Sequence, residues 1–295
     1  MNLSLPRSFP IAKAALAAAV IACAFALACS LAGCASGGTG SSSADADNTS
    51  ASTDGKTLRV AMELAYPPFE TKDDAGNPEG LAVDFIRDFG AAYGYDVQIE
   101  NTAWDGLIPS LQSDKADLVI SSMTITDERK QSVDFSDAYA MAQLAILANA
   151  DSGVASIDDL NQPGKKVAVK TGSTGDVYAT KNLTDAEIVR LADESACVTE
   201  VVQGKADGFL YDQLTIYRNH QANPDTTEAV FIPFQDAEEW GIAVKKGNTE
   251  LLDQLNAFIA QSKTDGEFDR LTEKYLADEK KAFDQYGFKW FFDFE

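Results

Sequence analysis

Apolar residues between Leu58 and Tyr275 alternate between short continuous runs and longer stretches in which they recur every three or four positions. Short runs indicate buried strands, and the wider spacing indicates amphipathic helices. In the first half of this region, strands are predicted at Leu58–Met62, Tyr95–Glu100 and Asp117–Ile120, and helices at Leu81–Phe89 and Trp104–Ser113. This order predicts a mainly parallel sheet with helices on both faces.

The second half of the chain repeats the alternation in a smaller unit. Strands are predicted at Val167–Val169, Glu187–Leu191 and Asp207–Leu210, and helices at Asp193–Gln203 and Asp212–Asn219. Val230–Ile232 is a candidate for one further short strand. The same order of elements predicts a second α/β sheet.

After this unit, a strand at Gly241–Val244 and a helix with an apolar face from Leu251 to Ile259 resume the first pattern. The smaller unit therefore lies between two parts of the larger one, and the chain crosses between them twice. The crossings are expected near Tyr139–Leu147 and Asp236–Gly241, where they would form a hinge. We predict a two-lobed α/β protein, with lobe 1 in residues 56–143 and 238–276 and lobe 2 in residues 144–237.

Residues 277–295 form an acidic extension that is rich in aromatic side chains. The aromatic residues are Phe283, Tyr286, Phe288, Trp290, Phe291, Phe292 and Phe294. Aromatic rings bury large apolar areas, so packing against a lobe is the simpler interpretation. A contact surface for a partner is the alternative.

The N-terminus has the pattern of an export signal. Arg7 and Lys13 precede the apolar stretch Ala14–Ala28, which is shorter than the ~20 residues that a spanning helix needs. The segment Leu31-Ala32-Gly33-Cys34 resembles the lipobox of bacterial lipoproteins. The resemblance implies that residues 1–33 are a signal peptide and that Cys34 carries the lipid. An ordinary signal peptide with a chance cysteine is the alternative.

Residues 34–55 are rich in Ser, Gly, Thr, Ala, Asn and Asp, which predicts a flexible tether behind the lipid. We therefore expect an extracytoplasmic protein that is anchored to the cell membrane through Cys34. Cys197 then remains as the one cysteine of the folded part, so no internal disulfide is expected. Its position in a predicted helix favours a buried structural thiol over a reactive one.

The net charge of −22 argues against nucleic acid as a partner, because phosphates need basic patches. The sequence contains no Cys/His cluster with the spacing of a metal site, so neither a metal nor a cofactor is expected. We expect the protein to be a monomer.

The segment Ser121–Arg129 follows a predicted buried strand and offers small hydroxyls, backbone groups and one arginine. These groups suit a small carboxylate. Glu63–Tyr66 also follows a strand directly. Because ligands of open α/β sheets bind beyond the carboxyl ends of the strands, both segments are expected at one crevice.

Several segments resemble the polar amino-acid branch of bacterial extracellular solute-binding proteins, family 3, which serve ABC importers. They are Tyr66–Glu70, Gly80–Asp84, Trp104–Pro109, Met123–Arg129, Val133–Ser136, Gly204–Asp207, Gly241–Val244 and Asp265–Gly266. The resemblance covers nearly all of the predicted folded part. It implies a type II periplasmic-binding-protein fold whose lobes close on a ligand about a two-crossing hinge.

The resemblance assigns the carboxylate of an amino acid to Arg129, whose planar fork can donate two charge-assisted bonds. The alternative is an arginine paired with a neighbouring acid. Thr124 and the backbone of Ser122 would add hydrogen bonds. From lobe 2, Ser173 and Thr174 lie at a helix start, where free N–H groups favour an anion, and either could touch the ligand.

Asp212 matches the acid that holds the ammonium group in the family, and an Asp there could also cap a helix. Tyr66 and Trp104 match the aromatic walls of the family's pocket, with core packing as the alternative.

Two charged residues, Glu63 and Lys170, match positions near the ligand side chain. Glu63 would accept hydrogen bonds from an amide, imidazole or ammonium and would repel an acidic ligand. Lys170 would oppose a cationic one, and the two charges could instead neutralise each other. Glutamine is slightly favoured, and a cationic amino acid is the other choice.

The predicted function is therefore the capture of a free polar amino acid for an ABC permease in the membrane. A small-molecule dehydratase on the same fold is an alternative, as is an adhesin or sensor-type binding domain.

Overall fold

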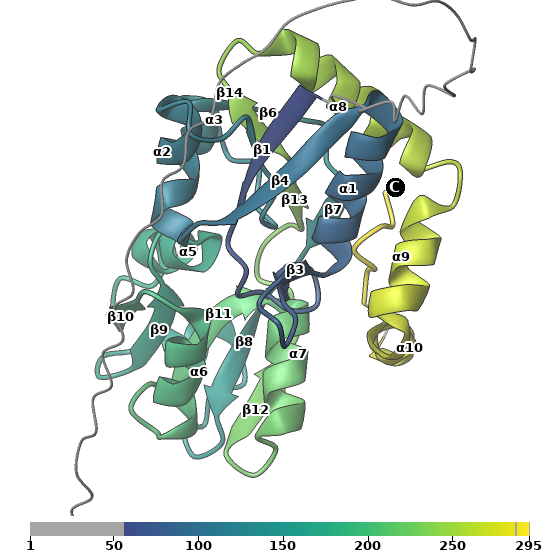
Figure 1. Cartoon of the computed structure of the whole chain (residues 1–295). Coiled ribbons are helices and arrows are strands. Elements are labelled where there is room, and N and C mark those ends of the chain that lie inside the picture. The colour runs from purple at the N-terminus through teal and green to yellow at the C-terminus, as the bar shows by residue number, and fades with distance from the viewer. Residues whose placement is uncertain (1–55, 287, 295) are drawn as a thin grey trace, which may run out of the picture. The chain divides into compact units, whose positions relative to one another are not determined.

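The computed structural model describes residues 56–286 and 288–294, which form two α/β sheets with their covering helices (Figure 1). The predicted signal peptide, the lipid site at Cys34 and the tether lie outside the described residues. We call the part around the first sheet lobe 1 and the part around the second sheet lobe 2.

The sheet of lobe 1 has five strands in the order β4-β1-β5-β14-β6. Their bounds are β1 (Lys56–Met62), β4 (Tyr95–Asn101), β5 (Leu118–Val119), β6 (Val133–Phe135) and β14 (Ala243–Lys245). The strands β4, β1 and β5 run parallel, whereas β14 pairs antiparallel with both β5 and β6. The expectation of a mainly parallel sheet is confirmed, with one reversed strand.

Alternation along β1 shows why helices cover both faces of this sheet. Leu58, Val60 and Met62 enter a core shared with α1 (Leu81–Tyr93), whereas Ala61 enters a separate core with α2 (Leu107–Gln112). Successive side chains of a strand point to opposite faces, so a strand buried on both sides has to be apolar throughout. The helices α8 (Thr249–Ser262) and α9 (Glu267–Tyr275) add to the first of these cores.

The sheet of lobe 2 has the order β10-β9-β11-β8-β12. Its strands are β8 (Leu144–Asn149), β9 (Lys166–Lys170), β10 (Glu187–Leu191), β11 (Gly208–Asp212) and β12 (Thr227–Val230). One face packs on α5 (Thr174–Asn182), and the other packs on α6 (Glu194–Val202) and α7 (Gln213–Ala222). The prediction of a strand at Val230–Ile232 is wrong: β12 ends at Val230, and Ile232 is exposed.

Each sheet contains its reversed strand where the chain enters from the other lobe, namely β8 and β14. The two crossings pair with each other as β7 (Ala140–Ala142) and β13 (Glu238–Trp240), an antiparallel ribbon between the lobes. Both crossings therefore lie side by side, as a hinge requires.

The remaining elements are short. They are the β2–β3 hairpin (Thr71–Lys72 and Pro78–Glu79), a 3-10 turn at Trp104–Gly106, α3 (Asp127–Lys130) and α4 (Ile157–Leu160). Tyr66 and Glu70 form an isolated bridge around the cis peptide bond Pro67–Pro68. Tyr66–Glu70 is therefore a turn and not part of a helix.

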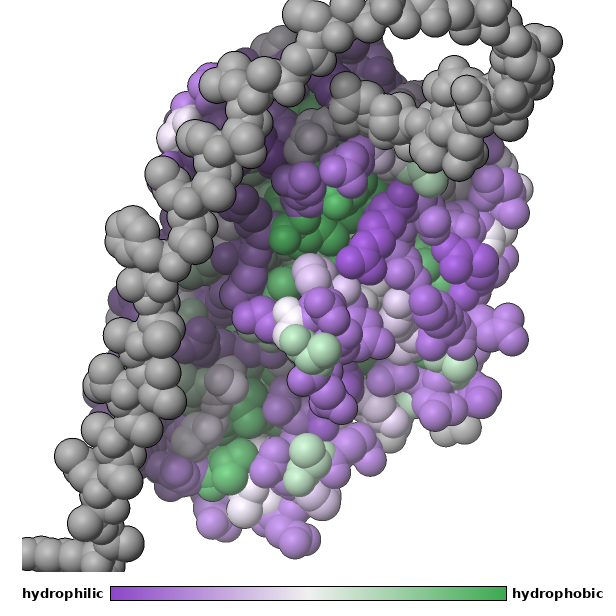
Figure 2. All heavy atoms as spheres, viewed as in Figure 1, coloured by the Kyte–Doolittle hydropathy of each residue, from purple (hydrophilic) through white to green (hydrophobic). Residues whose placement is uncertain are grey.

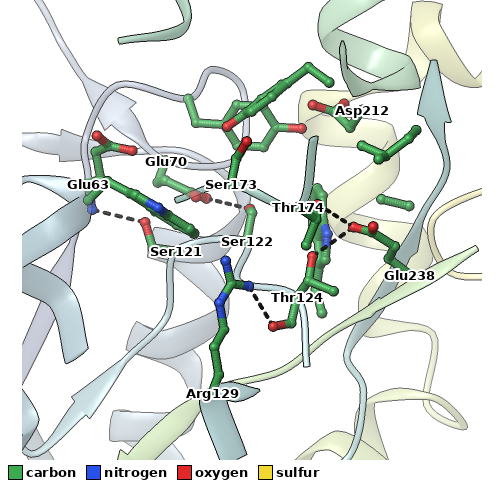
Figure 3. Close-up of a pocket in the computed structure, with 16 residues that line it drawn as sticks. Glu63, Glu70, Ser121, Ser122, Thr124, Arg129, Ser173, Thr174, Asp212 and Glu238 are labelled. Carbon is green, nitrogen blue, oxygen red and sulfur yellow. Dashed lines mark hydrogen bonds between the residues drawn. The ribbon is translucent and has the colours of Figure 1, made fainter. Parts of the chain in front are cut away.

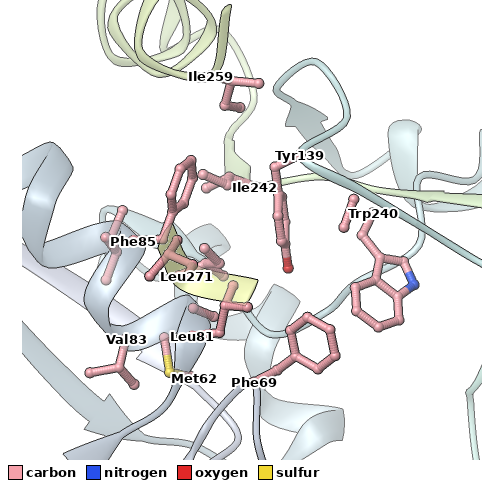
Figure 4. Packing of buried hydrophobic residues seen from close by; sticks show 14 of the residues in the cluster. Met62, Phe69, Leu81, Val83, Phe85, Tyr139, Trp240, Ile242, Ile259 and Leu271 are labelled. Carbon is pink, nitrogen blue, oxygen red and sulfur yellow. The ribbon is translucent and has the colours of Figure 1, made fainter. Parts of the chain in front are cut away.

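The C-terminal extension begins with α10 (Ala277–Tyr286) and packs mainly against lobe 1, with ring contacts to Tyr217 and Phe231 of lobe 2. Phe283, Trp290 and Phe291 are buried, and Phe291 contacts Phe69 and Trp240, which Figure 4 shows beside each other in the core. The backbone carbonyl of Phe291 also accepts a hydrogen bond of 2.7 Å from the N–H of Met141 in β7. The packing interpretation is confirmed for the aromatic residues of the extension whose side chains the structure describes.

Cys197 is buried in α6, as predicted. Burial raises the pKa of its thiol to about 12, so the sulfur stays protonated at neutral pH and is a poor nucleophile. On the face drawn in Figure 2, hydrophilic side chains cover most of the described surface, in keeping with the strongly acidic composition. Among the described helices, none has the length and hydropathy needed to cross a membrane.

Candidate functional site

A cavity lies between the two lobes, and residues from both lobes and from the hinge ribbon line it (Figure 3). Nine of the ten residues predicted for the ligand site are among its lining residues: Glu63, Tyr66, Trp104, Ser122, Thr124, Arg129, Ser173, Thr174 and Asp212. The tenth, Lys170, is not a lining residue but forms an ion pair with Glu63, which is. The lining residues that the sequence analysis did not single out as site residues are Glu70, Ser121, Ala142, Leu144, Tyr211, Glu238 and Trp240.

The turn after β5 is shaped by two serines. Ser122 has a positive φ of 48°, a conformation that few residues other than glycine adopt. The Ser121 hydroxyl accepts a hydrogen bond of 3.0 Å from the N–H of Glu63, and the Ser122 hydroxyl donates one of 3.1 Å to Glu70. The serine side chains therefore fix the neighbouring loop that carries Glu63 and Glu70, rather than pointing unpaired into the cavity.

Arg129 lies in α3, a single turn capped by Thr126. Its two terminal nitrogens donate to backbone carbonyls, to Thr124 at 2.7 Å and to Gly172 of lobe 2 at 3.1 Å. No carboxylate of the described chain forms an ion pair with it, so the alternative of an arginine paired with Asp127 or Glu128 is wrong. Burial lowers the pKa of Arg129, but a guanidinium remains charged at neutral pH.

The start of α5 brings two hydroxyls from lobe 2 to the cavity. Ser173 is the N-cap, and its oxygen accepts a hydrogen bond of 3.2 Å from the N–H of Asp176. Thr174 donates a hydrogen bond of 2.7 Å to Glu238. The next residue is glycine for a steric reason, because a Cβ on Gly175 would lie 2.4 Å from the carbonyl oxygen of Leu210. This close approach sets the helix start against β11.

Asp212 is both the last residue of β11 and the N-cap of α7. Its Oδ1 accepts hydrogen bonds from the N–H groups of Leu214 at 2.9 Å and Thr215 at 3.1 Å. Its Oδ2 is buried and has no hydrogen-bond partner among the described residues. Burial raises the pKa of Asp212, and the backbone donor of Thr215 opposes the rise. One oxygen thus caps the helix while the other is available to a cation.

Two aromatic residues border the cavity in different ways. Tyr66 is buried and stacks on Phe69, with ring centroids 5.5 Å apart, so it belongs to the core as well as to the lining. Trp104 is half-buried and lies near two cations, 5.3 Å from the Arg129 guanidinium and 5.2 Å from the Lys170 ammonium. Such distances allow cation–π attraction.

Glu63 and Lys170 form an ion pair between the lobes. The Lys170 side chain is only 3% exposed, and Glu63 is 12% exposed. The structure therefore brings together the two charges that the sequence analysis left either paired with each other or with a ligand. In the described state they are paired with each other.

Glu70 and Glu238 are the two acidic residues that the sequence analysis missed. Glu70 is 1% exposed, and burial raises its pKa well above the usual value. The only signal for Glu70 was its place in the Tyr66–Glu70 segment. Glu238 lies on a predicted hinge crossing, but nothing in the local sequence marks it as a cavity residue. The described residues contain no cluster of acids, histidines and cysteines placed to hold a metal ion.

Comparison with known proteins agrees with this architecture. The sequence model of bacterial extracellular solute-binding proteins, family 3, matches residues 58–278. The chain therefore belongs to this family, and its fold is the family's two-lobed α/β binding fold.

Among the relatives, a probable histidine-binding protein of Neisseria gonorrhoeae is 36% identical over 258 residues, which cover 86% of this chain and 94% of the relative. A solved structure of an ancestral arginine-binding protein bound to arginine is 37% identical, with a TM-score of 0.69 and coverage of 75% and 98%. An ancestral amino acid-binding protein, described as a precursor of cyclohexadienyl dehydratase, is 38% identical, with a TM-score of 0.68 and coverage of 74% and 94%. These relatives are named as binding proteins, and none is named as an enzyme.

Proposed function

We propose that this protein binds a free polar amino acid between its lobes and delivers it to an ABC permease. One observation carries the proposal: Arg129 and the free oxygen of Asp212 border the same cavity from opposite lobes. A cation without a carboxylate partner and a carboxylate oxygen without a donor are complementary to the carboxylate and ammonium of an amino acid.

The ligand carboxylate would contact Arg129 on lobe 1. The guanidinium would exchange a carbonyl partner for a carboxylate, with Thr124 and the start of α5 adding donors. Each charge-assisted hydrogen bond contributes ~1.5–3 kcal/mol net. Since the donors come from both lobes, binding and lobe closure are coupled, and the ligand favours the closed state by its contacts to lobe 2.

The ammonium would contact Asp212 Oδ2. Its positive charge would offset the burial that raises the pKa of this carboxyl, and Oδ1 would go on capping α7. The Tyr66 hydroxyl, which is also buried without a hydrogen-bond partner among the described residues, lies beside this carboxyl and could share the ammonium.

The ion pair of Glu63 and Lys170 favours a polar, uncharged side chain such as that of glutamine. A side-chain amide offers N–H donors to the carboxylate of Glu63 and an oxygen acceptor to the ammonium of Lys170. It can therefore bond to both residues without leaving a buried charge unpaired. A cationic side chain would have to compete with Lys170 for Glu63. It is the second choice, supported by the names of the arginine- and histidine-binding relatives.

The N-terminal pattern supports attachment to the outer side of the cell membrane by a lipid on Cys34, with residues 34–55 as a tether. A tethered domain would stay near the permease while its lobes open and close. We propose that it works as a monomer and without a cofactor.

Thermal unfolding of the purified chain with each of the twenty common amino acids would test the proposal. A ligand that binds only the folded state raises the melting temperature, by an amount that increases with its concentration. Glutamine is expected to give the largest shift, followed by the cationic amino acids. No shift with any of them at millimolar concentration would contradict amino-acid binding.

A further inference from the structure

Glu238 is the first residue of β13, on the second crossing between the lobes. The crossing is held beside the Thr124 segment by backbone hydrogen bonds from Ile125 to Glu239 at 2.8 Å and from Gly241 to Met123 at 3.0 Å. The side chain of Glu238 lines the cavity together with Thr124 and Thr174 (Figure 3). Glu238 therefore faces the ligand site from the hinge and not from either sheet.

One oxygen of Glu238 joins the two lobes. Its Oε2 accepts hydrogen bonds from the hydroxyl of Thr124 at 3.0 Å and from the hydroxyl of Thr174 at 2.7 Å. Thr124 follows the sheet of lobe 1, and Thr174 begins α5 of lobe 2. The described chain thus has a carboxylate bridge across the cleft.

The same carboxylate lies in the field of Arg129. Burial lowers the pKa of the guanidinium, and the charge of Glu238 is the largest influence that opposes this shift. Two threonine hydroxyls, a helix start and a guanidinium are the groups proposed above for the ligand carboxylate. In the described state, the two threonine hydroxyls of that subsite donate to a carboxylate that belongs to the protein.

We propose that Glu238 is an internal occupant of the carboxylate subsite and a determinant of its specificity, an inference that rests on the proposed function. Without ligand, Glu238 ties Thr124 to Thr174 across the cleft. A ligand carboxylate takes over these hydroxyls and displaces Glu238, since two carboxylates at one pair of donors repel each other. Glu238 keeps a partner on leaving, because its Oε1 accepts a hydrogen bond of 2.7 Å from Gln235. Glu238 therefore lowers the affinity for a ligand more strongly when the ligand places more negative charge at this subsite.

The decisive measurement compares an amino acid with its α-carboxamide, which keeps the ammonium and side chain but lacks the negative charge. Calorimetry would use the full chain in detergent and whichever of L-glutamine, L-histidine and L-arginine binds most tightly. Any effect of Glu238 on lobe closure applies to both ligands and cancels in the ratio of their affinities. Glu238→Ala is expected to raise this ratio about tenfold in favour of the free amino acid, because it removes a like charge.

Glu238→Gln keeps the size of the side chain and a hydrogen-bond acceptor but loses the charge, so it is expected to raise the ratio in the same direction. It also covers the case in which the alanine variant does not fold. Glu239→Gln is the matched control, since Glu239 is the exposed neighbour on the same strand, and its ratio should equal that of the wild type. A ratio within about twofold of the wild type for both Glu238 variants would overturn the proposal.

Hydrogen exchange of the unliganded chain separates this inference from the proposed function. In Glu238→Ala, amides of residues 122–126 and 171–176 should exchange several-fold faster, while Glu239→Gln should match the wild type. Unchanged exchange would overturn the tie between the lobes. If the wild type binds none of the three amino acids, the proposed function fails, yet the exchange experiment still decides whether Glu238 bridges the lobes.

Discussion

The two lobes meet at two places of opposite chemistry. On the cavity side, the contacts are polar: Glu63 with Lys170, Arg129 with Gly172, and Glu238 with Thr124 and Thr174. On the side of the C-terminal extension, the contacts are mainly aromatic. Phe283 meets Tyr217 of lobe 2 with ring centroids 6.1 Å apart, and Phe288 meets Phe231 at 4.6 Å.

This difference separates contacts that a ligand can replace from contacts that it cannot. A ligand with donors and acceptors can take over hydrogen bonds one for one, so the polar side can change partners at small net cost. Aromatic packing has no such substitute, because its stabilisation comes from area removed from water. We therefore expect substitutions on the cavity side to change ligand binding and substitutions on the aromatic side to change folding stability.

The largest effect is expected for Phe291→Ala, on the aromatic side. Phe291 is fully buried against Phe69 and Trp240, so its loss should lower the free energy of unfolding by about 3–5 kcal/mol. Urea unfolding measures this change, and Phe292→Ala, at a partly buried site against Phe268, should cost less. Because Trp240 also lines the cavity, Phe291→Ala tests whether the aromatic side and the cavity side are independent of each other. A loss of ligand affinity as large as that of a cavity variant would show that the two sides are not separate.

Arg129→Ala should have the next largest effect, and on binding rather than folding. The variant would leave the ligand carboxylate buried without its guanidinium, which should cost about 2–5 kcal/mol of binding free energy. Calorimetry with the ligand found by thermal unfolding measures the loss, and Lys130→Ala, at the exposed next position, is the control. Wild-type affinity in Arg129→Ala would remove the basis of the proposed carboxylate site.

Much of the fold follows from local patterns. The strands β1, β4 and β10 and the helix α6 were predicted to within two residues, and the helix α7 to within three, because each carries apolar residues at the period of its element. The strand β14 was predicted, at Gly241–Val244, but not as a reversed strand. The strand β8 was not predicted, because its first residues were expected to belong to a crossing between the lobes. The direction of these two strands depends on where the chain returns from the other lobe, which is a property of the topology and not of the three to six residues in each strand.

The candidate site divides in the same way. Arg129 and Asp212 could be singled out because they follow predicted strands in segments that resemble a family. Glu238 could not, since its place in the cavity depends on β13 pairing with β7 and lying beside the Thr124 segment, about 110 residues earlier in the chain. The pairing of Glu63 with Lys170 was left open because no sequence pattern fixes the distance between two lobes.

Asp212→Asn should weaken binding without unfolding the protein. Asparagine is as good an N-cap as aspartate, so α7 keeps its cap, while the charge opposite the ligand ammonium is lost. Affinity for the amino acid should fall by about 1.5–3 kcal/mol. Asp193→Asn, at an exposed N-cap of α6 that makes no side-chain hydrogen bond, should leave affinity unchanged. If Asp212→Asn binds as well as the wild type, the ammonium is not held by this carboxylate.

Glu194→Gln should have a smaller effect, on folding stability, that depends on pH. It tests whether a buried carboxyl close enough to feel the charge of the cavity residue Asp212 lowers the stability of the protein. Glu194 begins α6, and its Oε2 is buried without a hydrogen-bond partner among the described residues. Burial, and then the charge of Asp212, raise its pKa from 4.5 to about 8. The folded chain thus holds a proton that the unfolded chain releases between these values, so this group makes stability fall as the pH rises from about 4.5 to about 8.

Removing the charge of Glu194 should stabilise the protein at pH 9, by about 1–3 kcal/mol, and have little effect at pH 4.5. Melting temperatures of the two proteins across this range give the comparison, with Glu200→Gln on the same helix as the control. If the difference in melting temperature between the two proteins does not grow with pH, Glu194 does not become a buried charge in the folded protein. This carboxyl would then not lower the folding stability at high pH.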